Sequence, residues 1–273
     1  MRIFCTFLLA ILLAACSTVR LAYENADTYI RWRATDYLEV DGEMSDELDA
    51  AIASFMSWHR ANALPKYATL LGEAEQRFAR GLAAADLDWS YDAVMAQTRD
   101  SVRVAAEQMA PLLDQLTPVQ VAHFERQLAD DNRKFERENL RGGEREQRRR
   151  RTQRNVERLE DWLGTLSQAQ VDRVAQYSAR APLLDGMRDR DHKRLQAELL
   201  RLIHARQCRE RLPDEAVNWQ RGRDPAYAAA LEAARKEYFA MALDLDKSLS
   251  PKQRERGQRK LRGYAEDFRK LAK

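Results

Sequence analysis

The sequence predicts an all-α protein, an elongated multi-helix bundle of about eight or nine helices. Glycine and proline are scarce, with 10 and 7 among 273 residues, and no run of alternating β-branched residues bounded by turn residues indicates a strand. Apolar residues recur instead at spacings of three, four and seven, which places them on one face of a helix. Because such faces must bury against one another, we expect the helices to share a core.

The chain begins with a short apolar segment that is typical of a secretory signal. Arg2 supplies a positive charge, the residues from Phe4 to Ala15 are almost wholly apolar, and small residues close the segment. It is shorter than the roughly 20 residues that a permanent membrane-spanning helix needs. We therefore predict that residues 1–15 are a cleaved signal peptide and that residues 16–273 form a periplasmic domain.

The four residues "LAAC" at positions 13–16 resemble the lipobox of bacterial lipoproteins. The resemblance implies that Cys16 receives diacylglycerol, becomes the first residue after cleavage and gains a further acyl chain such as palmitate. Ser17, in place of an aspartate, looks like the signal for transport to the outer membrane. We expect an anchor on the periplasmic face of that membrane; the alternative is an ordinary signal peptide with a chance cysteine.

Helical spacing begins at Val19 and continues to the C-terminus. We expect a break at Pro65 and another at Gly142-Gly143, so the domain is either one bundle or two sub-bundles divided near residues 141–155. In chain order, the amphipathic faces lie in residues 19–37, 48–59, 67–82, 91–112, 121–135, 156–163, 171–177, 187–202, 227–245 and 261–271.

A short pattern occurs three times, as "LTPVQ" at 116–120, "LSQAQ" at 166–170 and "LSPKQ" at 249–253. Each copy predicts a helix start, because the Thr or Ser can cap the first free N–H groups and the Gln can return a hydrogen bond to the capping residue. The pattern also resembles, over five residues at a time, the repeat of Spy-type periplasmic chaperones. Those proteins are all-helical and bind unfolded clients on a basic, apolar concave face.

Two segments near the N-terminus resemble a family of proteobacterial lipoproteins that share a domain of unknown function. The first carries a Leu-x-Tyr-x-Asn start and the second a Trp-His-Arg run followed by Leu-Pro-x-Tyr. This resemblance implies an envelope lipoprotein and brings no reaction, cofactor or catalytic residue with it. The residues that carry it are Leu21, Tyr23, Asn25, Trp58, His59, Arg60, Leu64, Pro65 and Tyr67.

The strongest local charge bias is in residues 141–158, with eight arginines against three glutamates. Removal of residues 1–15 with Arg2 leaves 45 basic against 43 acidic residues, and an exported chain does not meet cytoplasmic nucleic acid, so we expect no nucleic-acid partner. The candidate partners are envelope proteins, peptidoglycan and anionic lipids. The candidate contact residues are Arg148, Arg149, Arg150 and Arg151; the alternative is a solvated helix surface with Glu-Arg pairs.

No motif indicates a catalytic, cofactor or metal site. His204 and Cys208 could share a helix face, but two ligands do not make a zinc site. His59, beside Trp58 and Arg60, is either an anion contact or a core-edge histidine. Cys208 is the one cysteine left unmodified after processing, so we expect no internal disulfide.

We therefore expect a non-catalytic structural or interaction module, anchored by lipid and without a cofactor. A Spy-like chaperone or envelope-stress sensor is the alternative reading. A hydrolase is a more distant one, because no pair of carboxylates stands out among the many in the chain.

Overall fold

A computed structural model describes residues 19–273, and the all-α prediction is confirmed for this part of the chain. The predicted signal peptide, the lipidation site Cys16 and Ser17 lie outside the described residues. Eleven labelled α-helices and two π-helical turns occupy the described range, and residues 19–24 are helical as well. The helices are α2 (Ala26–Leu38), α3 (Gly42–Trp58), α4 (Leu64–Ala79), α5 (Ala84–Leu113), α6 (Pro118–Phe135), α7 (Glu144–Leu163), α8 (Gln168–Arg180), α9 (Asp185–Ala205), α10 (Cys208–Val217), α11 (Pro225–Ser248) and α12 (Pro251–Leu271).

The eleven labelled helices outnumber the eight or nine expected, and α10 is one for which the sequence analysis found no apolar face. It has ten residues, and Pro213 lies inside it. The expected break at Pro65 is not a loop. The chain passes from α3 through the π-turn η1 (His59–Ala63) directly into α4, with Pro65 in the first turn of α4. Proline is tolerated there because the first N–H groups of a helix have no partner within it.

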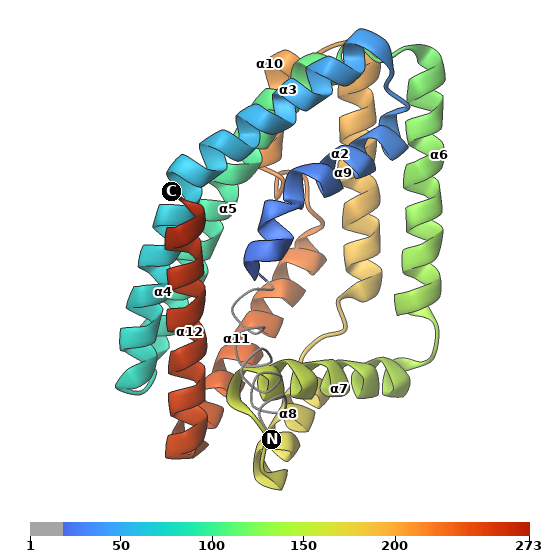
Figure 1. The fold of residues 1–273 in the computed structure, drawn as a ribbon. Coiled ribbons are helices and arrows are strands. Elements are labelled where there is room, and N and C mark those ends of the chain that lie inside the picture. The colour runs from blue at the N-terminus through green and yellow to red at the C-terminus, as the bar shows by residue number, and fades with distance from the viewer. Residues whose placement is uncertain (1–18) are drawn as a thin grey trace, which may run out of the picture.

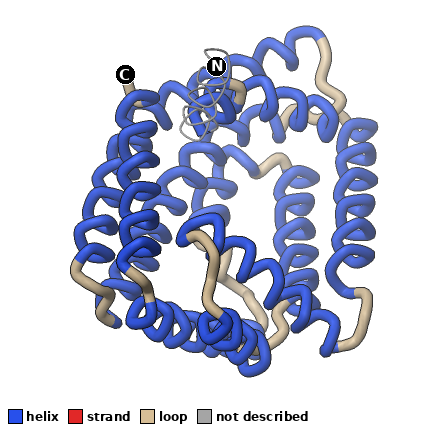
Figure 2. Tube along the Cα trace, turned by 60° about the horizontal axis from the view of Figure 1, so that its bottom comes forward, coloured by secondary structure: helices blue, strands red, loops and turns tan. Residues whose placement is uncertain are grey.

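The helices run along the edges of a broad frame. In Figure 1, α4 lies beside α12 on one side and α6 beside α9 on the other, with α3 across one end and α7 across the opposite end. The long helix α5 contacts α3, α4, α10 and α11. Figure 2 shows the same arrangement from a second direction.

Most of the buried apolar residues belong to two separate clusters. The larger joins α2, α3, α5, α6, α9 and α10 and contains Leu48, Leu116 and Cys208, none of which is exposed. The smaller joins α8 and α11, with Val174 and Met241 at its centre, and α7 packs against it. The chain leaves the larger cluster before α7, but α9 and α10 return to it. The two clusters therefore do not follow one another along the sequence.

The three predicted capping boxes are confirmed at the starts of α6, α8 and α12. The second and third copies also bind each other. The side-chain amides of Gln170 and Gln253 exchange hydrogen bonds of 3.1 and 2.9 Å, and both side chains are buried. Gln170 also donates to Ser248 O, and Gln253 donates to Thr165 O. The two helix starts are thus joined by a polar contact in which each amide is satisfied.

Helices α4 and α12 pack tightly against each other at Gly257. A Cβ atom added at Gly257 would lie 2.6 Å from a ring carbon of Phe78. At Gly263, two turns further along the same helix, an added Cβ would meet no atom within 4 Å. Glycine at 257 therefore serves close packing rather than backbone freedom.

We predict that Gly257→Val lowers the free energy of unfolding by about 1–3 kcal/mol, because the new side chain overpacks the contact with Phe78. Gly263→Val is the matched control on the same helix and should change stability by less than about 0.5 kcal/mol. Urea unfolding followed by circular dichroism measures both. Equal effects of the two substitutions would contradict the close packing at 257.

Candidate functional site

Two of the four candidate arginines bind the end of a neighbouring helix. Arg148 donates to Ser178 O and Ala179 O at 3.0 and 2.6 Å, and Arg151 donates to Ser178 O and Pro182 O at 2.6 and 2.7 Å. Those carbonyls lie at the C-terminus of α8, where no further turn of helix supplies donors. A guanidinium both satisfies them and complements the negative end of the helix dipole.

The other two arginines differ from each other. Arg150 donates to Arg141 O at 2.7 Å, beyond the π-turn η2 (Glu136–Leu140) that ends α6. Arg149 extends into solvent, with its side chain 66% exposed, and forms a two-pronged pair with Glu146. Three of the four candidates therefore bind backbone carbonyls within the fold, whereas the side chain of Arg149 is mainly exposed to solvent.

His59 lies in the π-turn η1, at the centre of a group of aromatic rings. Its Nδ1 is 2.9 Å from the hydroxyl of Tyr23, and the two rings stack with their centroids 5.6 Å apart. The ring centroids of Phe55 and Tyr67 each lie 5.6 Å from the centroid of the His59 ring. Five of the residues that carry the family resemblance, including Tyr23, Trp58 and Arg60, thus meet at one place.

This aromatic cluster connects helices, and its His59–Tyr23 pair is uncharged. Burial lowers the pKa of His59, so the imidazole is neutral at neutral pH. Burial also raises the pKa of Tyr23, whose hydroxyl therefore stays protonated. A neutral pair attracts an anion weakly, while Arg60 lies over the Tyr23 ring, 5.3 Å from its centroid. The cluster attaches the N-terminal helical segment to α3 and α4.

His204 and Cys208 do not face one another as a ligand pair would. His204 is exposed and pairs with Glu125 at 3.1 Å. Cys208 is buried, and burial together with the charge of Asp114 raises the pKa of its thiol to about 12, so it is a poor nucleophile and metal ligand. No group of three or more His, Cys, Asp or Glu side chains within residues 19–273 could hold a metal ion.

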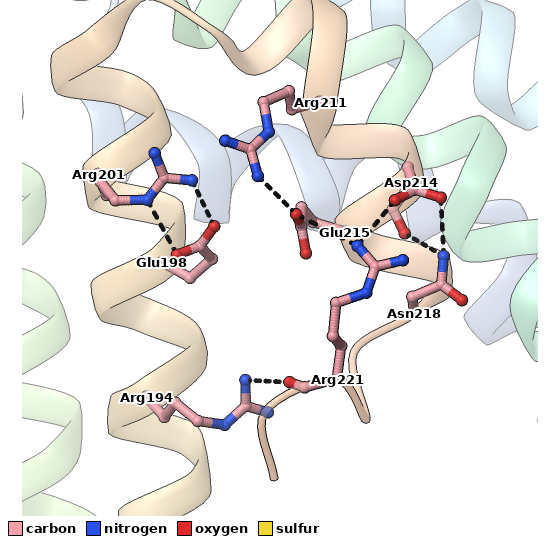
Figure 3. Close-up of polar contacts among 8 residues, drawn as sticks. All are labelled: Arg194, Glu198, Arg201, Arg211, Asp214, Glu215, Asn218 and Arg221. Carbon is pink, nitrogen blue, oxygen red and sulfur yellow. Dashed lines mark hydrogen bonds and ion pairs between the residues drawn. The ribbon is translucent and has the colours of Figure 1, made fainter.

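The corner between α9 and α10 carries a dense network of charges, drawn in Figure 3. Arg201 binds Glu198 through two hydrogen bonds of 3.0 and 2.5 Å, and Arg211 binds Glu215 at 2.9 Å. Arg221 reaches Asp214 at 3.0 Å, and its backbone carbonyl accepts from Arg194. Each carboxylate drawn there accepts a hydrogen bond, and that from Arg201 lowers the pKa of Glu198. The carboxylates of this corner are therefore occupied by ion pairs and hydrogen bonds within the fold.

Sequence analysis missed a second set of arginines on α7. Arg154 and Arg158 make no ion pair or side-chain hydrogen bond with any residue that the structure describes, unlike Arg148 and Arg151 one or two turns earlier. With Arg151 they follow spacings of three and four, so they share a helix face. That spacing is the signal that could have separated them from the rest of the run.

The half-buried, neutral state of His59 makes stability depend on pH. The unfolded chain binds a proton at this histidine near pH 6.5, whereas the folded chain binds it only at lower pH, so stability falls as pH drops through about 6.5. We predict that His59→Gln flattens this loss between about pH 7.5 and 5.5. His204→Gln, on an exposed histidine, should leave the loss unchanged. Urea midpoints at both pH values test this, and an unaltered slope in His59→Gln would contradict it.

Comparison with known proteins identifies a family. The model of a family of unknown function, DUF6279, matches residues 36–216, about two thirds of the chain. The run from Trp58 to Tyr67 lies inside the match, and the start from Leu21 to Asn25 precedes it. No curated protein and no solved structure matches the chain. The expected resemblance to a domain of unknown function is thereby confirmed, and the chain belongs to the family of unknown function DUF6279.

Proposed function

We propose that the protein is a lipid-anchored envelope lipoprotein, whose helical domain acts as a non-catalytic structural or interaction module at the periplasmic face of the outer membrane. The anchor is diacylglycerol on Cys16, with a further acyl chain such as palmitate. The partners are envelope proteins, peptidoglycan or anionic lipids.

The observation that carries this proposal is the attachment of the N-terminal helical segment to the body of the domain. Arg20 lies 3.5 Å from the carboxylate of the buried Asp267 on α12, and Tyr23 binds His59 in η1. Val19 is three residues after Cys16, so an acylated Cys16 keeps the domain close to the membrane surface. Such a short connection suits a module that meets its partner at that surface. No helix among the described residues is long and apolar enough to span a membrane.

The state of the reactive side chains supports a non-catalytic role. The buried Asp86 accepts hydrogen bonds from the Ala83 amide, Arg77 and Arg80, and these lower its pKa to about 2. The buried Asp246 binds Arg254 at 2.8 Å. Asp86 is therefore an ionised partner in the fold and not a proton donor at neutral pH, while Asp246 is held in its ion pair with Arg254.

The Spy-like chaperone or stress sensor is the alternative. Its sequence basis is the repeated Leu-Thr-x-x-Gln pattern, and all three copies have a structural use as helix caps. In two copies the glutamines are buried against each other. The module without chaperone activity is therefore the better-supported proposal, and a hydrolase stays the more distant one.

We predict that Cys16→Ser abolishes the incorporation of radiolabelled palmitate into the protein in growing cells, because no other residue carries the acyl chains. Cys208→Ser is the matched control and should retain the label, since this thiol is buried in the folded domain. Fractionation of the same cells should find the wild-type chain with the outer membrane. Label retained in Cys16→Ser would refute the anchor.

A further inference from the structure

An apolar pocket lies between α4, α7, α11 and α12. Its volume is about 500 Å³, within the range of roughly 300–1,000 Å³ that is usual for small-molecule sites. The walls are mostly hydrocarbon, with Leu159 and Trp162 from α7, Met241 and Leu245 from α11, and Leu261 from α12. Its polar lining residues are Asn155, Arg158, Trp162 and Tyr238, together with an Asp246 that is already paired with Arg254.

A second pocket of about 360 Å³ adjoins the first along α7. Asn155 and Arg158 line both pockets, so the two share a wall. The second pocket has the opposite character, since four arginines line it against a single acidic residue. They are Arg151, Arg154, Arg158 and Arg188, and the acid is Asp185.

The positive charge of this basic pocket is not neutralised within the described part of the chain. Asp185, the acidic residue of this pocket, is already paired with Arg188 at 3.6 Å. Arg154 and Arg158 have neither an ion pair nor a side-chain hydrogen bond there. The Nε atom of Arg151 is buried and also lacks a partner, although its other nitrogens bind α8. Guanidinium groups gathered without counter-charges favour binding of an anion with several oxygen atoms.

We propose that these two adjoining pockets bind an anionic lipid with a single acyl chain, such as a long-chain fatty acid or a lysophospholipid. The acyl chain occupies the apolar pocket between α7, α11 and α12. The carboxylate or phosphate head lies against Arg154 and Arg158 in the basic pocket. The proposal concerns a separate ligand and does not depend on the anchor at Cys16.

The chemistry of the walls favours this ligand over others. A free phosphate would use the basic pocket and leave the apolar one empty. An extended peptide would bring backbone N–H and C=O groups into walls that offer them few partners, at a cost for each group left unbonded. The acyl chains of the protein's own anchor would match the apolar pocket, but a diacylglyceryl head carries no negative charge for the arginines.

Photolabelling of the full-length chain, purified as cells process it in a neutral detergent, tests the proposal. The probe is a C16 fatty acid with a photoactivatable diazirine in its chain. We expect saturable labelling of peptides from α7 and α11, located by mass spectrometry, and competition by palmitate that is much stronger than competition by the uncharged hexadecanol. Labelling that is absent, or spread evenly over the chain, would overturn the proposal.

Substitutions on α7 test the role of the basic pocket. Arg154→Glu and Arg158→Glu should each raise the probe concentration for half-maximal labelling by about five- to tenfold, which is the usual effect of losing one charge-assisted contact. Arg145→Glu changes the charge of the same helix equally, at an exposed residue outside both pockets, and should change that concentration by less than about twofold. Equal effects of all three substitutions would overturn the assignment of the head group.

Two further measurements separate the lipid from other occupants. Ala242→Trp, which fills the apolar pocket, should abolish the labelling of α7 and α11. Should that variant fail to fold, the exposed arginine variants still decide the question. Cys16→Ser should be labelled as strongly as the wild-type chain. Labelling that appears only in Cys16→Ser would mean that the protein's own anchor fills the pocket, and would overturn the proposal of a separate ligand.

Discussion

The binding of the α8 C-terminus by Arg148 and Arg151 is the contact on which the packing of α7 and the two pockets beside it depend. The last carbonyls of a helix have no partners within it, and here two guanidinium groups from α7 supply them. This contact sets how α7 crosses α8. Leu159 and Trp162 then face α11 and α12, while Arg154 and Arg158 line the basic pocket. The walls of both pockets therefore follow from one helix-end interaction.

Polar contacts also join the ends of other helices where the chain changes direction. Asp114, at the end of α5, accepts hydrogen bonds from the backbone N–H groups of Cys208 and Arg209 and so caps α10 from another helix. Asp246 accepts from the N–H of Leu82 and from Arg254. The core is split into two clusters, so burial of apolar surface alone does not fix how the helices meet. Directional hydrogen bonds at the corners supply that geometry.

The helices could be predicted from the sequence, but the contacts that connect them could not. Apolar spacing and the three capping boxes are local signals, so the all-α fold and the starts of α6, α8 and α12 could be predicted. The partners of Arg148 and Arg151 lie about 30 residues further along the chain, and no local pattern distinguishes such arginines from solvated ones. The hydrogen bond between Tyr23 and His59 joins residues that are 36 positions apart in the sequence. The family resemblance identified both residues, but their contact depends on the π-turn, which has no sequence signal of its own.

Hydrogen–deuterium exchange tests most directly whether the arginines of α7 fix this part of the fold. The variants are Arg151→Met and Arg149→Met, which remove the same charge from positions two residues apart, one bound to α8 and one exposed. The account predicts faster amide exchange in residues 168–184 and in α7 for Arg151→Met, because the carbonyls at the end of α8 lose their donors. Arg149→Met should match the wild-type chain. Identical exchange in the two variants would contradict the central role of the arginine contact.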